Sequence, residues 1–180
     1  MLSNCDIVAI SELKHAFPFS FPGFSVLRSR IIDGEEHRGG VAVCIKPFLV
    51  KFIHNVRLEY DQVWFQLTLT ADVWWGACYV PPRDSPFYKN ESFAKIQEFC
   101  TQGKVIILGD LNARMPNLDM FNSTGVTYQP NPDRGSNANG CKVASLCADF
   151  GLVPLNHRQP LDIISKAISL SGNVVTGYLS

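Results

Sequence analysis

The stretch Lys104 to Arg114, KVIILGDLNAR, joins four aliphatic residues directly to Gly-Asp-Leu-Asn. Side chains of an extended chain alternate in direction, so Asp110 and Asn112 are expected to project to the same side. A carboxylate can bind a hard cation or accept a proton, and an amide can donate hydrogen bonds to a phosphate oxygen. The pair therefore predicts a polar site at the end of a buried strand, where loops often carry function.

Two other polar residues occupy similar positions. Glu12 follows the apolar run Asp6 to Ile10, and Tyr79 lies near the end of the run Val73 to Val80. If these strand ends share one rim, their side chains form a polar site above an apolar core. A carboxylate from each of two strands suits Mg²⁺, which takes few protein ligands and keeps water and phosphate in its shell.

Each of these residues also has a purely structural interpretation. Taken alone, Glu12 is the exposed end of a strand, and Tyr79 is a core aromatic residue with its hydroxyl at the surface. Asp110 and Asn112 are both common in turns. An aliphatic strand followed by Gly-Asp-x-Asn is nevertheless a specific combination, which favours the functional interpretation. Asn139-Gly140 is most simply a turn, and the three tryptophans are expected in the core.

The elements that must position these residues are mainly strands, with two or three helices. Strands are expected at residues 6–10, 41–45, 63–69, 73–80, 105–108 and 152–155, and one or two more within 161–180. Helical spacing predicts helices within 87–100 and 141–150, and residues 117–140 are expected to form a long loop. Several strands are apolar enough to be covered on both faces. The pattern therefore predicts an α/β or α+β sandwich of packed sheets with helices outside.

Composition narrows the class of protein. The 180 residues suit a single domain, and 16 basic against 16 acidic residues exclude a bulk electrostatic attraction to nucleic acid. Four arginines in predicted loops could still border the site: Arg38, Arg83, Arg114 and Arg134. The six cysteines lack C-x-x-C spacing, which favours buried, reduced thiols in an intracellular protein. The N-terminus is unlike a signal peptide, and no apolar run is long enough to span a membrane.

The order of several segments resembles the endonuclease/exonuclease/phosphatase superfamily. These segments are DIVAISELK, RGGVAVCIK, YVPPRDSPFY, VIILGDLNAR and NANGCKVASLCADFGLVPLN. More closely, they look like the endonuclease domain of non-LTR retrotransposons, which is similar to apurinic/apyrimidinic endonucleases and is associated with a reverse transcriptase. The resemblance covers roughly Cys5 to Asn156 and is most specific at Gly109–Arg114.

The resemblance implies a fold, an activity and a set of partners. The fold would be a four-layer α/β sandwich, with two face-to-face β-sheets flanked by helices. The activity would be phosphodiester hydrolysis that depends on Mg²⁺ or Mn²⁺, with DNA as the partner and no small-molecule cofactor or membrane. A nuclear location would follow, and nothing in the resemblance specifies an oligomeric state.

The resemblance also assigns roles to particular residues. Glu12 resembles the metal-ligand glutamate, and Asp110 resembles the aspartate that orients or activates the attacking water. Asn112 resembles the phosphate-binding asparagine, and Tyr79 resembles the tyrosine that contacts the scissile phosphate. Asp162, in LDIISK, either resembles the aspartate that supports a catalytic histidine or is an unrelated strand residue.

Two family features are absent from the sequence. The family begins with a strand that carries an asparagine and ends with Ser-Asp-His, whereas this chain starts eleven residues before Glu12 and contains no Ser-Asp-His. The expectation is therefore a single incomplete domain over residues 1–180 that is a weak or inactive nuclease. Two alternatives stay open. One is a non-catalytic remnant that binds nucleic acid or phosphate, and the other is a phosphoesterase of the same superfamily with a different substrate.

Overall fold

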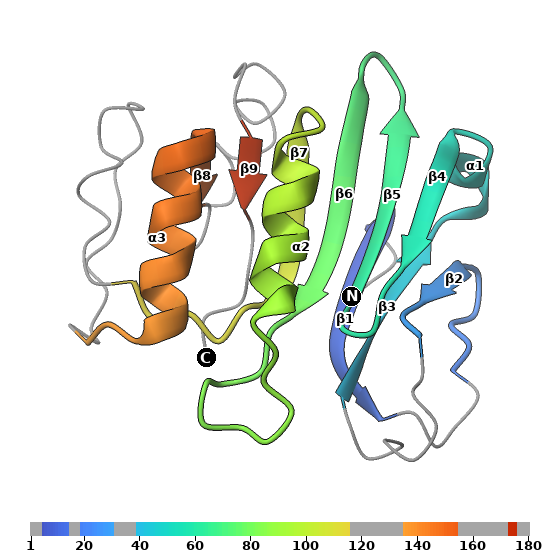
Figure 1. The fold of residues 1–180 in the computed structure, drawn as a ribbon. Helices are drawn as coiled ribbons and strands as arrows, with labels where there is room; N and C mark the ends of the chain where they lie inside the picture. The colour runs from blue at the N-terminus through green and yellow to red at the C-terminus, as the bar shows by residue number, and fades with distance from the viewer. Residues whose placement is uncertain (1–4, 15–18, 31–38, 116–134, 155–172, 176–180) are drawn as a thin grey trace.

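The computed structural model describes residues 5–14, 19–30, 39–115, 135–154 and 173–175. These residues form a mixed α/β fold with two β-sheets (Figure 1). The elements are β1 (Ile7–Lys14), β2 (Ser25–Arg28), β3 (Gly39–Ile45), α1 (Pro47–Val50), β4 (Ile53–Leu58), β5 (Gln62–Thr68), β6 (Asp72–Tyr79), α2 (Glu91–Cys100), β7 (Val105–Asp110), α3 (Ala138–Phe150), β8 (Leu152–Pro154) and β9 (Asn173–Val175).

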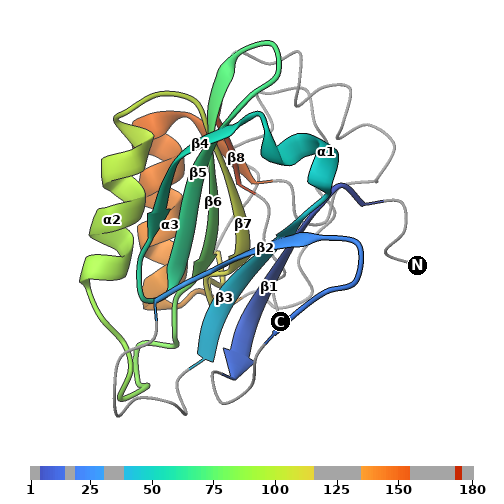
Figure 2. The same ribbon diagram turned by 90° about the vertical axis from the view of Figure 1, so that its right-hand side faces the viewer.

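The smaller sheet has three antiparallel strands in the order β1-β3-β2. The larger sheet has the order β4-β5-β6-β7-β9-β8, antiparallel from β4 to β6 and parallel from β6 to β8. Figure 2 shows α2 and α3 on one face of the larger sheet and the smaller sheet on the other. The described residues thus form three layers, and the prediction of packed sheets with helices outside is confirmed at this level.

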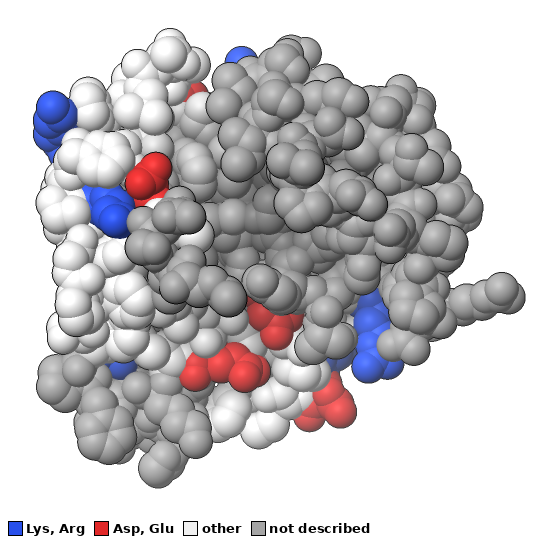
Figure 3. Space-filling model, turned by 180° about the vertical axis from the view of Figure 1, so that it is seen from behind, with Lys and Arg blue, Asp and Glu red and all other residues white. Residues whose placement is uncertain are grey.

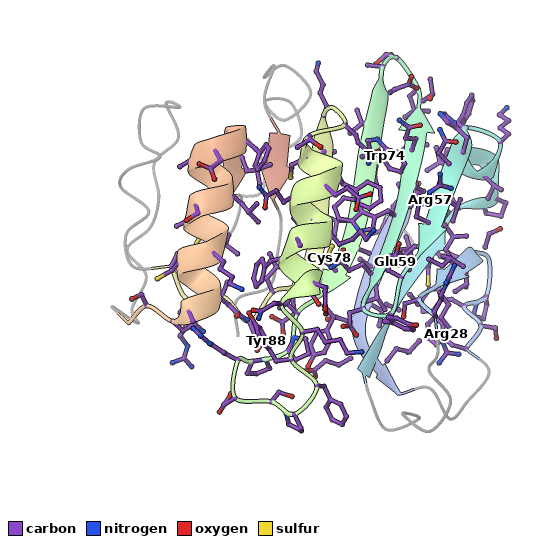
Figure 4. All side chains as sticks on the ribbon, in the orientation of Figure 1. Arg28, Arg57, Glu59, Trp74, Cys78 and Tyr88 are labelled. Carbon is purple, nitrogen blue, oxygen red and sulfur yellow. The ribbon has the colours of Figure 1, made fainter. Side chains whose placement is uncertain are left out.

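Strand β6 illustrates how both faces of the larger sheet are buried. Trp74 and Cys78 belong to the core between this sheet and the helices (Figure 4), whereas Ala77 and Tyr79 belong to the core between the two sheets. This alternation follows from the two-residue period of a strand. Tyr79 is therefore directed toward the smaller sheet.

The aromatic core agrees with expectation. Trp64 is fully buried, and its ring stacks on Phe99 of α2 with 4.1 Å between ring centroids. Trp74 is buried against the same phenylalanine, and Trp75 packs against the core between the sheets. Within the described segments, no helix has the length and apolar character to cross a membrane.

Several element boundaries differ from expectation. Strands β2 and β4 and the short helix α1 lie where no element was expected. Helix α3 begins at Ala138 rather than Cys141, so the turn interpretation of Asn139-Gly140 is wrong, because both residues lie in its first turn. Strand β9 falls within the predicted strands of residues 161–180. Most of the predicted loop 117–140 lies outside the described residues.

All six cysteines are free thiols. Four are buried, namely Cys44, Cys78, Cys100 and Cys147, which agrees with the expectation of buried, reduced thiols. Cys5 and Cys141 are exposed instead.

Candidate functional site

Glu12 lies in a β-bulge of β1. Ile10 pairs with Ala42 of β3 while Leu13 pairs with Gly40, so β1 holds one extra residue between these two pairs. Glu12 has a φ of 57°, a region that residues other than glycine seldom occupy. Bulges beside functional sites re-aim a side chain, and strained backbone of this kind clusters at such sites.

Tyr79 connects Glu12 to the larger sheet. The hydroxyl Oη of Tyr79 donates a hydrogen bond of 2.9 Å to Glu12 Oε1, and this bond crosses between the two sheets. Burial, followed by the hydrogen bond and the charge of Glu12, raises the pKa of Tyr79 above its ordinary value. The phenol therefore stays protonated and acts as a hydrogen-bond donor.

Asp110 ends β7 directly beside Tyr79 in the parallel register of β6 and β7. Paired residues of neighbouring strands project to the same face, so Asp110 shares the side of the sheet on which Tyr79 meets Glu12. Burial raises the pKa of Asp110, the backbone amide of Asn112 lowers it, and the charge of Glu12 raises it again. The net direction is upward. A second carboxylate near enough for its charge to raise the pKa of Asp110 makes a pair that suits a divalent cation.

Asn112 closes the turn after β7. Its backbone N–H donates to Asp110 Oδ1 at 2.8 Å, and its side-chain Nδ2 donates to the carbonyl oxygen of Val80 at 3.0 Å. The backbone N–H of Val80 in turn donates to the carbonyl oxygen of Asp110 at 2.9 Å. The Gly-Asp-Leu-Asn turn is thus bonded to the end of β6. An amide nitrogen carries two hydrogens, and the bond to Val80 uses one of them.

Gly109 has a structural reason to be glycine. Its φ is 116°, and a Cβ added there would lie 2.1 Å from the carbonyl oxygen of Cys78, its partner on β6. Because only glycine lets the two backbones approach this closely at that angle, the residue fixes where Asp110 emerges.

Asn139 also contacts the site segments, although the sequence pattern assigned it to a turn. Its side chain is 1% exposed, and Nδ2 donates to the carbonyl oxygens of Pro81 at 3.2 Å and Leu111 at 3.0 Å. Both acceptors lie in the segments that follow β6 and β7. No local sequence signal reveals these contacts, because both partners are far away along the chain.

Asn137 caps the N-terminus of α3. Its Oδ1 accepts hydrogen bonds from the backbone N–H groups of Gly140 at 2.8 Å and Arg114 at 3.0 Å. Its Nδ2 donates to the carbonyl oxygen of Asn112 at 2.8 Å. An asparagine directly before a helical apolar pattern is a typical N-cap signal, which could have placed the start of the helix correctly.

The arrangement allows a test of whether a metal ion fits. In the ranges that the structure describes, no group of three or more His, Cys, Asp or Glu side chains could hold a metal. Glu12 and Asp110 still fit Mg²⁺, because this ion commonly binds one or two carboxylates and completes its shell with water and phosphate. From behind, several acidic side chains gather near the lower edge of the molecule (Figure 3).

Four of the five predicted site residues come together: Glu12, Tyr79, Asp110 and Asn112. Asp162 lies outside the described residues, so its role stays a prediction.

A mixed α/β sandwich with carboxylates and hydrogen-bond donors on one rim is suited to phosphoester hydrolysis. A model of the Endonuclease/Exonuclease/phosphatase family matches residues 1–164, and the chain belongs to this family. Members of the family are typically metal-dependent. A comparison with curated proteins finds no match to the chain.

Proposed function

We propose that this protein is a Mg²⁺-dependent DNA endonuclease of the non-LTR retrotransposon type that acts in the nucleus. The observation that carries the proposal is the hydrogen bond from Tyr79 to Glu12 beside Asp110, which gathers two carboxylates and a protonated phenol between the sheets. Family membership supports phosphodiester chemistry. The segments YVPPRDSPFY and GDLNAR support DNA as the substrate. The proposal also implies a four-layer sandwich, with a further helical layer on the outer face of the smaller sheet.

Asp110 is the base in this proposal. Hydrolysis of a phosphodiester requires removal of a proton from the attacking water. The pKa of Asp110 is raised, chiefly by burial, and a carboxylate with a raised pKa is a stronger base than an exposed one. The amide of Asn112 holds one oxygen of this carboxylate, which fixes its orientation toward the water.

Tyr79 and Asn112 supply hydrogen-bond donors near the phosphate. A phenol carries one hydrogen, and that of Tyr79 is donated to Glu12, so Tyr79 orients this carboxylate. Tyr79 can donate to a phosphate oxygen only if its hydroxyl first releases Glu12. Asn112 can donate its second amide hydrogen to a phosphate oxygen while it keeps the bond to Val80. Donors of this kind stabilise charge that develops in the transition state.

Glu12 is the residue that would hold Mg²⁺ or Mn²⁺, and Asp110 lies beside it as the base. When bound there, the ion would supply Lewis-acid polarisation of a phosphoryl oxygen and stabilisation of the leaving alkoxide. Arg83 and Arg114 are exposed in the segments that follow β6 and β7, where they can contact the DNA backbone. Such contacts position a duplex without reading its sequence.

Nicking of supercoiled plasmid tests the proposal. The purified chain is assayed with Mg²⁺ and with a chelator, beside Glu12→Gln, Asp110→Ala and the control Asp149→Ala, which alters an exposed carboxylate near the end of α3. Loss of a preorganised group commonly lowers the rate by about 10²–10³-fold, so both site variants should fall by at least that factor while the control does not.

Other outcomes separate the alternatives. Nicking that survives both site substitutions would falsify the assignment. A folded chain that binds DNA without Mg²⁺ and never nicks it would instead be a binding remnant. Turnover of inositol phosphates without cleavage of DNA would identify a phosphoesterase with another substrate.

A further inference from the structure

Asn139 bridges the two chain segments that carry the site. Its amide group has two hydrogens, and each is donated to a different backbone carbonyl, that of Pro81 and that of Leu111. Pro81 follows β6 two residues after Tyr79, and Leu111 lies between Asp110 and Asn112. A single side chain of α3 therefore connects the ends of β6 and β7.

These bonds are shielded from water. Asn139 is 1% exposed and Leu111 is 7% exposed. Hydrogen bonds in a buried environment are electrostatically stronger than in water, and the groups they join are costly to leave unpaired. A shift of either carbonyl away from Asn139 would break a buried bond, so the positions of the two segments are tightly coupled.

Asparagine at position 139 leaves a buried polar atom unpaired within the described part of the chain, and packing alone does not explain why this residue is present. The side-chain oxygen Oδ1 of Asn139 is buried and has no hydrogen-bond partner among the described residues. An apolar residue of similar size would avoid an unsatisfied buried acceptor. What asparagine provides, and leucine cannot, is the pair of donors to the two strand ends.

The N-terminus of α3 is held closely against the same segment. Asn137 bonds to the backbone of both Asn112 and Arg114. A Cβ added at Gly140 would lie 1.7 Å from the carbonyl oxygen of Arg114, so helix and segment are packed at backbone contact. On the other side, Lys142 Nζ donates to Tyr88 Oη at 3.0 Å, below the lower end of α2 (Figure 4). The helix end thus has little freedom to move, which makes it a firm support for Asn139.

We propose that Asn139 is a positioning residue, which sets Asp110 and Asn112 against Tyr79 by tying the ends of β6 and β7 to α3. Its catalytic consequence rests on the proposed nuclease function. The geometric part does not, because it concerns only how the strand ends are held. Asn139 itself touches no reacting atom and acts through the Pro81 and Leu111 carbonyls.

Hydrogen exchange tests the geometric part without any need for catalysis. The backbone N–H of Val80 donates to the carbonyl oxygen of Asp110 and so reports whether the strand ends stay together. In Asn139→Leu, which keeps the branching and the number of side-chain heavy atoms but removes both donors, exchange at Val80 should rise at least tenfold relative to amides in the middle of β5. The control Leu146→Ala removes core contacts from the same helix at an 8% exposed residue. Leu146→Ala should raise the hydrogen-exchange rates at Val80 and in the middle of β5 by the same factor, so the ratio of the two rates stays unchanged.

Kinetics test the catalytic part. At a temperature where the variant is fully folded, kcat for plasmid nicking should fall at least tenfold in Asn139→Leu, with KM for DNA changed less than twofold. Leu146→Ala should keep the kcat of the unmodified chain. Asn139→Ser, which retains one donor, should lie between the two and replaces Asn139→Leu if that variant does not fold.

The results of the exchange and kinetic experiments distinguish the geometric role of Asn139 from its catalytic role. If Asn139→Leu folds and the exchange rate at Val80 relative to β5 is unchanged, the inference is wrong, whether or not the protein nicks DNA. Faster exchange with unchanged kcat overturns the positioning role in catalysis. If the unmodified chain does not nick, the proposed function fails, and the exchange ratio alone decides the inference.

Discussion

Replacing Gly109 by alanine tests whether the site depends on the close approach of β6 and β7. Gly109 has a φ of 116°, and the added Cβ would meet the Cys78 carbonyl oxygen at 2.1 Å. A side chain held in this sparsely populated region costs about 1–3 kcal/mol. The opposing atom is backbone, so the strands themselves must separate, and overpacking of this kind costs about 1–3 kcal/mol. The two effects predict a loss of unfolding free energy of about 2–6 kcal/mol.

Urea unfolding measures this loss, and two other glycines separate its causes. Gly103 has a φ of 148°, and no atom in the described part of the chain lies within 4 Å of an added Cβ, so Gly103→Ala carries the conformational cost alone. Gly135 also has no atom of the described residues within 4 Å of an added Cβ and lacks a left-handed φ, so Gly135→Ala carries neither cost. The free energy of unfolding should fall most at Gly109, less at Gly103 and least at Gly135. A loss at Gly109 no larger than at Gly103 would refute the steric argument.

Three further predictions concern the site and the thiols. Tyr79→Phe removes the bond to Glu12 and should lower the unfolding free energy by about 0.5–1.5 kcal/mol in urea, because the carboxylate partner is exposed; no measurable loss would contradict the bond. Burial raises the pKa of Asp110, so its charge destabilises the fold as pH rises through that pKa. Asp110→Asn should therefore be more stable than the unmodified chain in urea at neutral pH, and this advantage should disappear below the ordinary carboxyl pKa of about 3.9. A stability advantage that persists below that pH would show that the buried charge of Asp110 is not its cause. Brief alkylation of the native chain should modify only Cys5 and Cys141, because the other thiols are buried and burial raises the pKa of each. Mass spectrometry counts the modified thiols, and early labelling of any third cysteine would show that the core opens locally.

The parts of the fold that were predictable from sequence are those whose signal is local. Strands β3, β5, β6 and β7 are runs of apolar residues that end at turn residues, and each lies within one or two residues of its expected position. The candidate site residues were predicted by a similar local rule, since Glu12, Tyr79 and Asp110 are polar groups at or just past the ends of such runs.

The features that sequence reasoning missed depend on distant partners or on irregular backbone. Strand β4 carries a register shift between His54 and Arg57, and Asn55 within it has a φ of 51°, so its alternation is broken. Asn139 was misplaced because its two acceptors lie 28 and 58 residues away in the sequence. An Asn-Gly pair is a common turn signal, and only the tertiary structure shows that this one belongs to a helix.

The bond between Tyr79 and Glu12 joins residues 67 positions apart and in different sheets. At a synthesis rate of about 5–20 residues per second, roughly 3–13 s pass on the ribosome between the two residues, and Asp110 emerges later still. Contacts between residues so distant in sequence also form slowly during folding. A growing or partly folded chain therefore contains the residues of the site without the site itself. Assembly of the candidate site would therefore come late in folding, after its separate strands have formed.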